Sequence, residues 1–403
     1  MINTMRRYYF DYAAGTPVDS RAEKAMRLYW SKKFGNPGAL HWFGQEASAA
    51  VFQARDIIAK ALGAKYQEII FTSSATEANN LALRGVIKSF KSFKSPKIIV
   101  SSIEHDSILN TARDLERDGV GIVYLPVNKD GLVDLKKLEA TLDERTILVS
   151  VMYVNNEVGT IQPIAKISEI IRNFREAISH KSSVKSPVAY PLLHTDAVQA
   201  FNYLNCNVND FGVDLLTLSA QKIYGPKGAG ALYARQEIRD KRPMTYISPI
   251  ITGGSVQEYG LRGGTENVPA IVGFGKAVEL VTYSREKENS RLRKLQEYFL
   301  GRMKKIAPKA KLNGPEDLEK RNPNNLNFYF PGSTAQDLLI KLDLAGFAVS
   351  PGAACTARTC QPSHVLMAIG HSEERAMSSL RFTFGRPTTK AEVDKLLGAM
   401  TKI

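Results

Sequence analysis

Between residues 45 and 235 the chain alternates short apolar runs with longer amphipathic segments. The apolar runs, rich in Val, Ile and Leu, are residues 68–72, 97–102, 121–127, 146–154, 190–197, 213–220 and 230–235. Amphipathic segments at residues 47–62, 77–89, 107–118 and 164–178 separate most of them. Continuous apolar runs are typical of strands buried on both faces, so the pattern predicts an α/β fold with a mostly parallel seven-stranded sheet between helices. Only a short turn joins the last two runs, which favours one antiparallel strand there.

The pattern changes after about residue 265. A long charged helical segment at residues 271–306 is followed by short apolar runs at 325–330, 346–350 and 378–384. This pattern predicts a smaller α+β domain. We expect a large domain over residues 16–262 and a small domain formed by residues 1–15 together with 263–403. Residues 179–191, with their Ser, Lys and Pro content, indicate a surface loop insertion.

Composition excludes several classes of protein. With 44% hydrophobic and 23% charged residues in 403, the chain is neither disordered, collagenous nor a coiled coil. No apolar run approaches the roughly 18 residues that a bilayer span requires, so membrane binding is not predicted. Asp11 interrupts the N-terminal apolar stretch, which argues against a secretory signal. Three cysteines do not form a disulfide framework, which favours a reducing, cytoplasmic location.

The net charge of +14 raises the question of a nucleic-acid partner. The basic residues are spread along the chain, and Lys88, Lys91, Lys94 and Lys97 have the spacing of an exposed helix stripe. No nucleic-acid module motif accompanies them, so nucleic-acid binding is not the predicted function. The six histidines show no metal-ligand spacing, and no metal site is expected.

Polar residues that carry chemistry follow five of the apolar runs. In an open α/β sheet, ligands bind beyond the carboxyl ends of the strands. The residues found there are Ser73 to Glu77, Glu104 and His105, Asn155 to Glu157, Asp196 and Gln199, and Ser219, Gln221 and Lys222. Each alone has an ordinary structural interpretation, such as a helix cap or a solvated lysine. Together they offer a lysine for a Schiff base, a carboxylate for a pyridine nitrogen and a phosphate turn, which pyridoxal phosphate requires.

The segment SAQKIYGPKGAGALYAR at residues 219–235 resembles the cofactor-lysine segment of cysteine desulfurases of the NifS/IscS kind, in the class V aminotransferase family. Further similar motifs run in the family's order from Tyr9 to Thr389. They are YFDYAAGTPVD (9–19), FGNPGALH (34–41), FTSSATEANNLAL (71–83), VNNEVGTIQPI (154–164), HTDAVQ (194–199), RGGTENVPAIVG (262–273) and SSLRFTFGRPTT (378–389). The resemblance therefore covers nearly the whole chain and implies a fold of the pyridoxal-phosphate transferase type I.

The resemblance also implies roles for single residues. Lys222 matches the Schiff-base lysine that later moves protons, and His105 the histidine that stacks on the cofactor ring. Asp196 matches the partner of the pyridine nitrogen, and Gln199 the partner of the ring oxygen. The remaining cofactor contacts implied are Ala75, Thr76, Ser219 and Gln221, together with Thr265, which reaches the phosphate of the neighbouring subunit in a homodimer. Arg381 matches the residue that binds the substrate carboxylate, and Asn156 one that lies near both that carboxylate and the cofactor. With Lys222 and Cys355, His105 is implied to be catalytic.

The segment SPGAACTAR at residues 350–358 resembles the loop that carries the family's catalytic cysteine, here Cys355. The implied enzyme is a cysteine desulfurase, which takes sulfur from L-cysteine and leaves L-alanine and a persulfide on Cys355. A protein acceptor would then receive the sulfur for iron–sulfur cluster assembly or for tRNA or cofactor thiolation. Cys360 is either a second relay thiol or incidental, and Cys206 is interpreted as structural.

Three positions depart from the family's pattern. Gln221 stands where a histidine is usual, Tyr259 where an arginine is common, and Pro351 stiffens a loop that is usually supple. A neutral amide cannot move a proton, so one acid–base step is expected to be slower or rerouted. Two alternatives therefore stay open: a selenocysteine lyase or other β-eliminating lyase, and a degenerate homologue that acts as a docking subunit.

Overall fold

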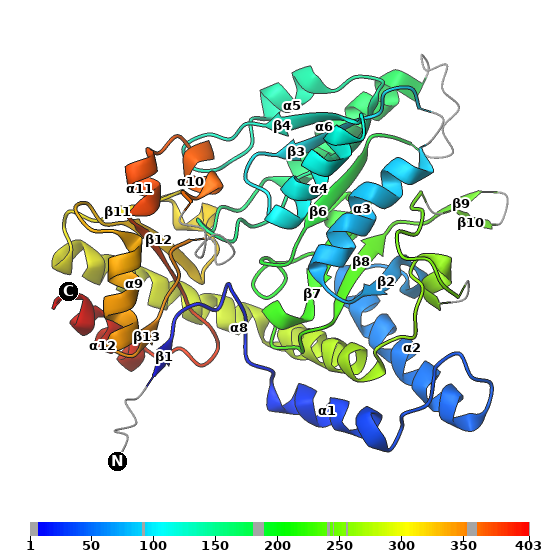
Figure 1. Ribbon diagram of the computed structural model, residues 1–403, viewed down its shortest axis with the longest axis horizontal. Helices are drawn as coiled ribbons and strands as arrows, with labels where there is room; N and C mark the ends of the chain where they lie inside the picture. The colour runs from blue at the N-terminus through cyan, green and yellow to red at the C-terminus, as the bar shows by residue number, and fades with distance from the viewer. Residues whose placement is uncertain are drawn as a thin grey trace.

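The computed structural model describes residues 7–90, 93–179, 189–239, 242–244, 246–254, 257–352 and 361–402. A seven-stranded sheet in the order β2-β8-β7-β6-β5-β3-β4 forms the centre of its larger part (Figure 1). The strands are β2 (Ile69–Thr72), β3 (Lys97–Ser101), β4 (Gly121–Leu125), β5 (Thr146–Ser150), β6 (Leu192–Asp196), β7 (Leu215–Ser219) and β8 (Gly230–Ala234). Each lies in one of the seven apolar runs. β8 is antiparallel to both neighbours and the other pairs are parallel, which confirms the predicted fold class.

Helices cover both faces of this sheet. Alternate strand residues such as Ile69 and Phe71 pack with α2 (Trp42–Leu62), α6 (Ile164–Ser179) and the first half of α8. The residues between them, such as Ile70, pack with the helices of the opposite face, α3 (Ala75–Ser89) and α4 (Asp106–Arg117). This two-sided burial is the reason that the strands are continuously apolar in sequence. Three further helices and a hairpin complete the part before α8: α1 (Ser20–Ser31), α5 (Leu135–Thr141), α7 (Val208–Phe211), β9 (Glu237–Arg239) and β10 (Arg242–Met244).

A smaller body with its own core follows along the chain. Its three-stranded antiparallel sheet has the order β11-β12-β14, and β1 pairs in parallel with β13. Its elements are β1 (Tyr8–Tyr9), β11 (Lys311–Leu312), β12 (Asn325–Tyr329), α9 (Ala335–Leu344), β13 (Phe347–Ala348), α10 (His364–Ala368), α11 (Glu373–Met377), β14 (Ser379–Thr383) and α12 (Lys390–Met400). The α+β structure predicted for the chain after residue 265 is therefore confirmed. The exact domain boundaries stay a prediction.

Two segments connect the bodies. Helix α8 (Val268–Ile306) places residues such as Phe274 in the core of the large sheet and Phe299 in the core of the small one. In Figure 1 it runs from the small body at the left to beneath the large sheet. The N-terminal segment first joins the small body through β1 and then crosses to α1.

Two remaining expectations concern loops and membranes. The predicted surface insertion at residues 179–191 falls largely on residues 180–188, which lie outside the described residues. Among the helices that the structure describes, none is both long and apolar enough to span a bilayer.

Candidate active site

A cavity of about 310 Å³ lies at the carboxyl ends of the parallel strands, between the large and small bodies. Ten of the residues predicted from the sequence line it: Ala75, Thr76, His105, Asn156, Asp196, Gln199, Ser219, Gln221, Lys222 and Arg381. The N-terminal segment contributes Ala13 and Ala14, and the small body contributes His364. The structure thus brings residues from at least six separate chain segments to one site.

Two predicted residues are not in this group. Thr265 is exposed and lines a different hollow, beside Phe34 and Asn36. Cys355 lies outside the described residues, as does Cys360. Cys206 is fully buried, in agreement with a structural role, and burial raises its pKa to about 12.

The N-terminus of α3 forms one wall of the cavity. Ser74 caps the helix by accepting a hydrogen bond from the Glu77 amide at 3.2 Å. The amides of Ala75 and Thr76 are in the first turn, where backbone N–H groups have no partner within the helix. Those N–H groups and the positive end of the helix dipole favour a bound anion. β8 packs closely against this turn, because a Cβ atom at Gly230 of β8 would lie 2.5 Å from the carbonyl carbon of Ser74.

Asp196 ends β6 and is held by a hydrogen-bond network. Its Oδ1 accepts from the Val198 amide at 2.9 Å, and its Oδ2 accepts from Nδ2 of Asn79 at 2.8 Å. The same amide nitrogen of Asn79 lies 2.8 Å from Oγ of Ser107, which contacts Nδ1 of His105 at 2.9 Å. Because Asp196 and His105 share this network, the carboxylate and the imidazole are fixed relative to each other.

Lys222 follows β7 and reaches the N-terminal segment. Its Nζ donates to the carbonyl oxygens of Ala13 and Ala14, at 2.6 and 2.7 Å. Nε2 of Gln199 also donates to the Ala13 carbonyl, at 3.0 Å. The carbonyl of Gln221 accepts from Oγ1 of Thr16 at 2.9 Å, so the lysine turn and the N-terminal segment are bound at several points. The amine is thereby oriented by backbone groups.

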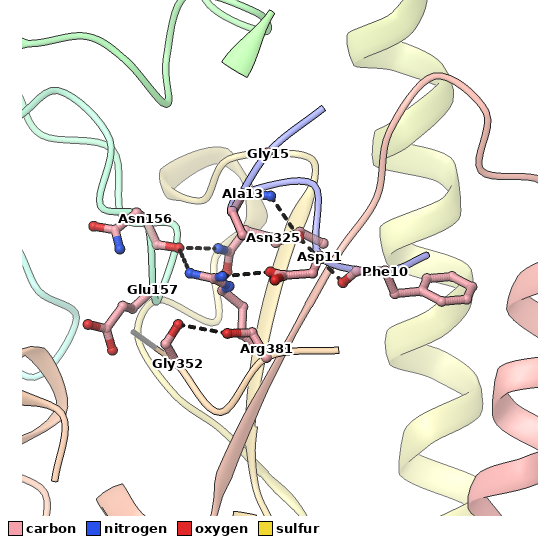
Figure 2. Close-up of polar contacts among 12 residues, drawn as sticks. Phe10, Asp11, Ala13, Gly15, Asn156, Glu157, Asn325, Gly352 and Arg381 are labelled. Carbon is pink, nitrogen blue, oxygen red and sulfur yellow. Dashed lines mark hydrogen bonds and ion pairs between the residues drawn. The ribbon is translucent and has the colours of Figure 1, made fainter. Parts of the chain in front are cut away.

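Arg381 lies on β14 and is 2% exposed. Its Nη2 pairs with Oδ1 of Asp11 at 2.7 Å, and its Nη1 donates to the Asn156 carbonyl at 2.9 Å. Figure 2 shows Asp11 and Asn156 on opposite sides of the guanidinium group. Nε of Arg381 is buried and has no partner among the described residues. A guanidinium group has five N–H donors, so donors remain for a further acceptor such as a substrate carboxylate.

Two buried titratable groups lie behind the cavity. Glu104 accepts hydrogen bonds from Oγ of Ser101 and from the Met152 amide, both at 2.6 Å. Burial raises the pKa of its carboxyl to about 8, and the charge of Asp196 adds to this rise. Burial also lowers the pKa of His194, in the middle of β6, to about 3. At neutral pH, Glu104 is therefore largely protonated and His194 is neutral.

Several residues that the structure brings to the site carry little or no signal in the sequence. Asn79 lies one turn after the phosphate turn on α3, a spacing that offers only a weak signal. Asp11 and Ala13 belong to the N-terminal motif, but the motif does not reveal that they contact Arg381 and Lys222. His364 had no signal at all, because it follows no strand of the large sheet.

Comparison with known proteins agrees with this geometry. Residues 8–396 match the Aminotransferase class-V family. The chain is 44% identical to Cysteine desulfurase IscS of Dictyoglomus turgidum over 398 residues, which cover 99% of this chain and 94% of that protein. It is also 44% identical to Cysteine desulfurase IscS 1 of Archaeoglobus fulgidus, over 96% of this chain and 94% of that protein.

Solved structures give the same result. A NifS-like protein superposes with a TM-score of 0.87 at 34% identity, over 98% of both chains. The structure described as SspA in complex with cysteine superposes with a TM-score of 0.75 at 36% identity, over 93% of this chain and 98% of that one. The chain belongs to the class-V aminotransferase family, and the resemblance to NifS/IscS-type cysteine desulfurases is confirmed.

Proposed function

We propose that this protein is a pyridoxal-phosphate-dependent cysteine desulfurase that converts L-cysteine to L-alanine and an enzyme persulfide on Cys355. The observation that carries the proposal is one cavity lined by an amine, a buried carboxylate, an imidazole, a helix N-terminus and a guanidinium group. Curated relatives at 44% identity over nearly the full chain are named cysteine desulfurases, which supports the same activity.

The residues of the cavity fit pyridoxal phosphate. The amides of Ala75 and Thr76, with the Ser219 hydroxyl, suit its phosphate, and Asp196 suits a protonated ring nitrogen. His105 and Gln199 would contact the ring, and Gln221 would lie beside Lys222. When bound, the cofactor supplies an aldehyde for amines and a ring that withdraws electrons from the substrate α-carbon.

The protein's own groups orient the substrate and move protons. Lys222 would hold the cofactor through its aldehyde, and its amine would be the group that takes a proton at the substrate α-carbon. Arg381 binds the substrate carboxylate, with Asn156 beside it, while Asp11 holds the guanidinium group in place. The carbonyls of Ala13 and Ala14 keep the lysine amine on the cavity side of the N-terminal segment.

Cys355 would supply the thiolate that takes the substrate sulfur. Described residues before and after its segment, Gly352 and Ser363, both lie against Glu157. Oγ of Ser363 donates to Oε2 of Glu157 at 2.5 Å, and a Cβ atom at Gly352 would lie 3.1 Å from the same oxygen. Glu157 lines the cavity, so Gly352 and Ser363 both lie next to a cavity-lining residue.

A homodimer is part of the proposal. Large apolar side chains of α1, α2 and the loop between them are exposed: Trp30, Phe34, Leu40, Trp42 and Phe52. Such a patch marks an interaction surface. Thr265 lines a hollow beside Phe34, so a second copy on this face would lie next to Thr265. Size-exclusion chromatography with light scattering should give about twice the mass of 44.6 kDa.

The decisive experiment traces the sulfur of L-cysteine onto the protein. The holoenzyme is treated with L-cysteine, and its peptides are analysed by mass spectrometry. A gain of one sulfur on the Cys355 peptide is expected, with loss of sulfide release but retained cofactor in Cys355→Ala. Cys360→Ala is the matched control and should keep activity. Full activity of Cys355→Ala would favour a selenocysteine lyase or other β-eliminating lyase, and no turnover by the purified protein would favour a docking subunit.

The destination of the sulfur and the location of the protein are also proposals. A protein acceptor, in iron–sulfur cluster assembly or thiolation, would remove sulfur from Cys355. A cytoplasmic location is proposed from the low cysteine content and the family.

A further inference from the structure

A second imidazole, that of His364, lines the cavity together with His105. His364 is the first residue of α10, whose N-cap is Ser363. Oγ of Ser363 accepts from the Leu366 amide at 3.2 Å and donates to Glu157 at 2.5 Å. Because Val365 and Leu366 pack on Ile103, the start of α10 is fixed against the segment that carries Glu104 and His105.

The hydrogen bond of His364 determines which ring nitrogen carries the proton. Its Nε2 lies 2.9 Å from the backbone carbonyl oxygen of Glu104. A carbonyl oxygen only accepts, so Nε2 of His364 is the protonated nitrogen. Nδ1 of the neutral ring then has a lone pair. In the part of the chain that the structure describes, Nδ1 has no hydrogen-bond partner, and it is not sealed from solvent.

His105 is held by the opposite nitrogen. Its Nδ1 accepts a hydrogen bond from the Ser107 amide at 3.1 Å, so the proton of the neutral ring is on Nε2. His105 therefore offers an N–H donor beyond its anchored edge, whereas His364 offers an acceptor. The two imidazoles of the cavity have the same tautomer but opposite hydrogen-bonding functions.

We propose that His364 is a specificity-determining residue whose Nδ1 accepts a hydrogen bond from the thiol of the substrate. The inference rests on the proposed function. In that function Lys222 and the cofactor engage the substrate amine, and Arg381 engages its carboxylate. The thiol is the remaining polar group of cysteine, and His364 supplies an acceptor for it. L-Alanine, the product, has no S–H group, so the contact distinguishes substrate from product.

The test uses two substitutions, each of which keeps a polar atom near the position of one ring nitrogen. His364→Asn keeps a polar atom near the position of Nδ1, and His364→Gln keeps one near Nε2. Both are made in a Cys355→Ala background, so that bound cysteine is not desulfurated. The dissociation constants of L-cysteine and L-alanine are measured from the change in cofactor absorbance. Asn and Gln variants of His371, a histidine outside the cavity lining, are the matched controls and should bind both ligands unchanged.

We expect His364→Asn to bind both ligands within about twofold of its parent. His364→Gln should weaken the binding of L-cysteine about three- to tenfold, which is the value of one neutral hydrogen bond, and should leave the affinity for L-alanine unchanged. The proposal is overturned if His364→Gln binds L-cysteine normally while His364→Asn does not, or if both ligands weaken equally. Failure of the proposed function gives a different result, because the wild-type enzyme would then gain no sulfur on the Cys355 peptide after treatment with L-cysteine.

A second measurement does not depend on the variants folding. Nitrogen-15 NMR of histidine-labelled, cofactor-free wild-type protein should show the Nε2–H tautomer for both His364 and His105. A proton on Nδ1 of His364 would contradict the proposal, because the cavity would then receive a donor in place of an acceptor.

Discussion

Gly230→Ala tests whether the close approach of β8 to the N-terminus of α3 forms the phosphate site. The added Cβ atom would lie 2.5 Å from the carbonyl carbon of Ser74, 2.7 Å from its oxygen and 2.9 Å from the Ala75 nitrogen. All three are backbone atoms, so no side chain can rotate away. Carbon atoms in contact are normally about 3.5–4.0 Å apart, so the turn at Ser74 and Ala75 must move by about 1 Å.

This displacement has two measurable consequences. Overpacking of this kind costs about 1–3 kcal/mol of stability. A shift of about 1 Å is also enough to remove one hydrogen bond to a charged ligand, worth about 1.5–3 kcal/mol, or roughly 10- to 100-fold in affinity for pyridoxal phosphate. The cofactor-free variant should therefore unfold at a lower temperature than wild type and bind the cofactor more weakly.

The assay is titration of cofactor-free protein with pyridoxal phosphate, followed by absorbance, with thermal unfolding measured in parallel. Gly301→Ala is the matched control, since Gly301 lies on an exposed face of α8 with no atom within 4 Å of the added Cβ. In a helix, alanine should stabilise by about 0.5–1 kcal/mol over glycine and leave cofactor binding unchanged. If Gly230→Ala bound the cofactor within twofold of wild type and unfolded no earlier, the reasoning about this contact would be wrong.

Three further predictions concern buried charge. Burial lowers the pKa of His194 to about 3, so below pH 6.5 the unfolded chain binds a proton that the folded protein does not. The free energy of unfolding should therefore fall from pH 6.5 toward pH 3. Denaturant unfolding of His194→Gln should show a flatter pH dependence. For Glu104 the pKa is raised to about 8, so its contribution to folding stability is complete below pH 4.5 and is lost as the pH rises toward 8. Glu104→Gln should remove this loss of stability. An unchanged dependence of the free energy of unfolding on pH would contradict the assignment. Arg381→Lys should raise the KM for L-cysteine about 10- to 100-fold with unchanged cofactor affinity, because an ammonium group cannot hold Asp11, Asn156 and a carboxylate in one plane; steady-state kinetics with an unaltered KM would refute this role.

The sequence was sufficient for the large sheet. Each of its seven strands lies in an apolar run, because strands buried on both faces need a continuous apolar sequence. The sequence was less informative for helices with little buried surface. Helix α1, which buries only Ala22 and Met26, was not predicted, since a mostly solvated helix leaves a weak apolar pattern.

The strand ends also predicted much of the site. Lys222, Asp196 and His105 each follow a strand of one parallel sheet, and the carboxyl ends of such strands meet along one edge. Their convergence therefore follows from local sequence once the sheet is known. The resemblance to the family added their expected roles.

Other parts of the site depend on contacts between distant segments. Asp11 and Arg381 form an ion pair across 370 positions of sequence, and His364 reaches the Glu104 carbonyl across 260. No local pattern encodes such pairs, because the first forms only when distant segments of the small body pair with each other, and the second only when the small body packs on the large one. The sequence by itself determined which segments become strands and which chemical groups stand at their ends. Only the tertiary structure decided which ring nitrogen of His105 and of His364 is held by a hydrogen bond to the protein, and so which donors and acceptors remain for a ligand.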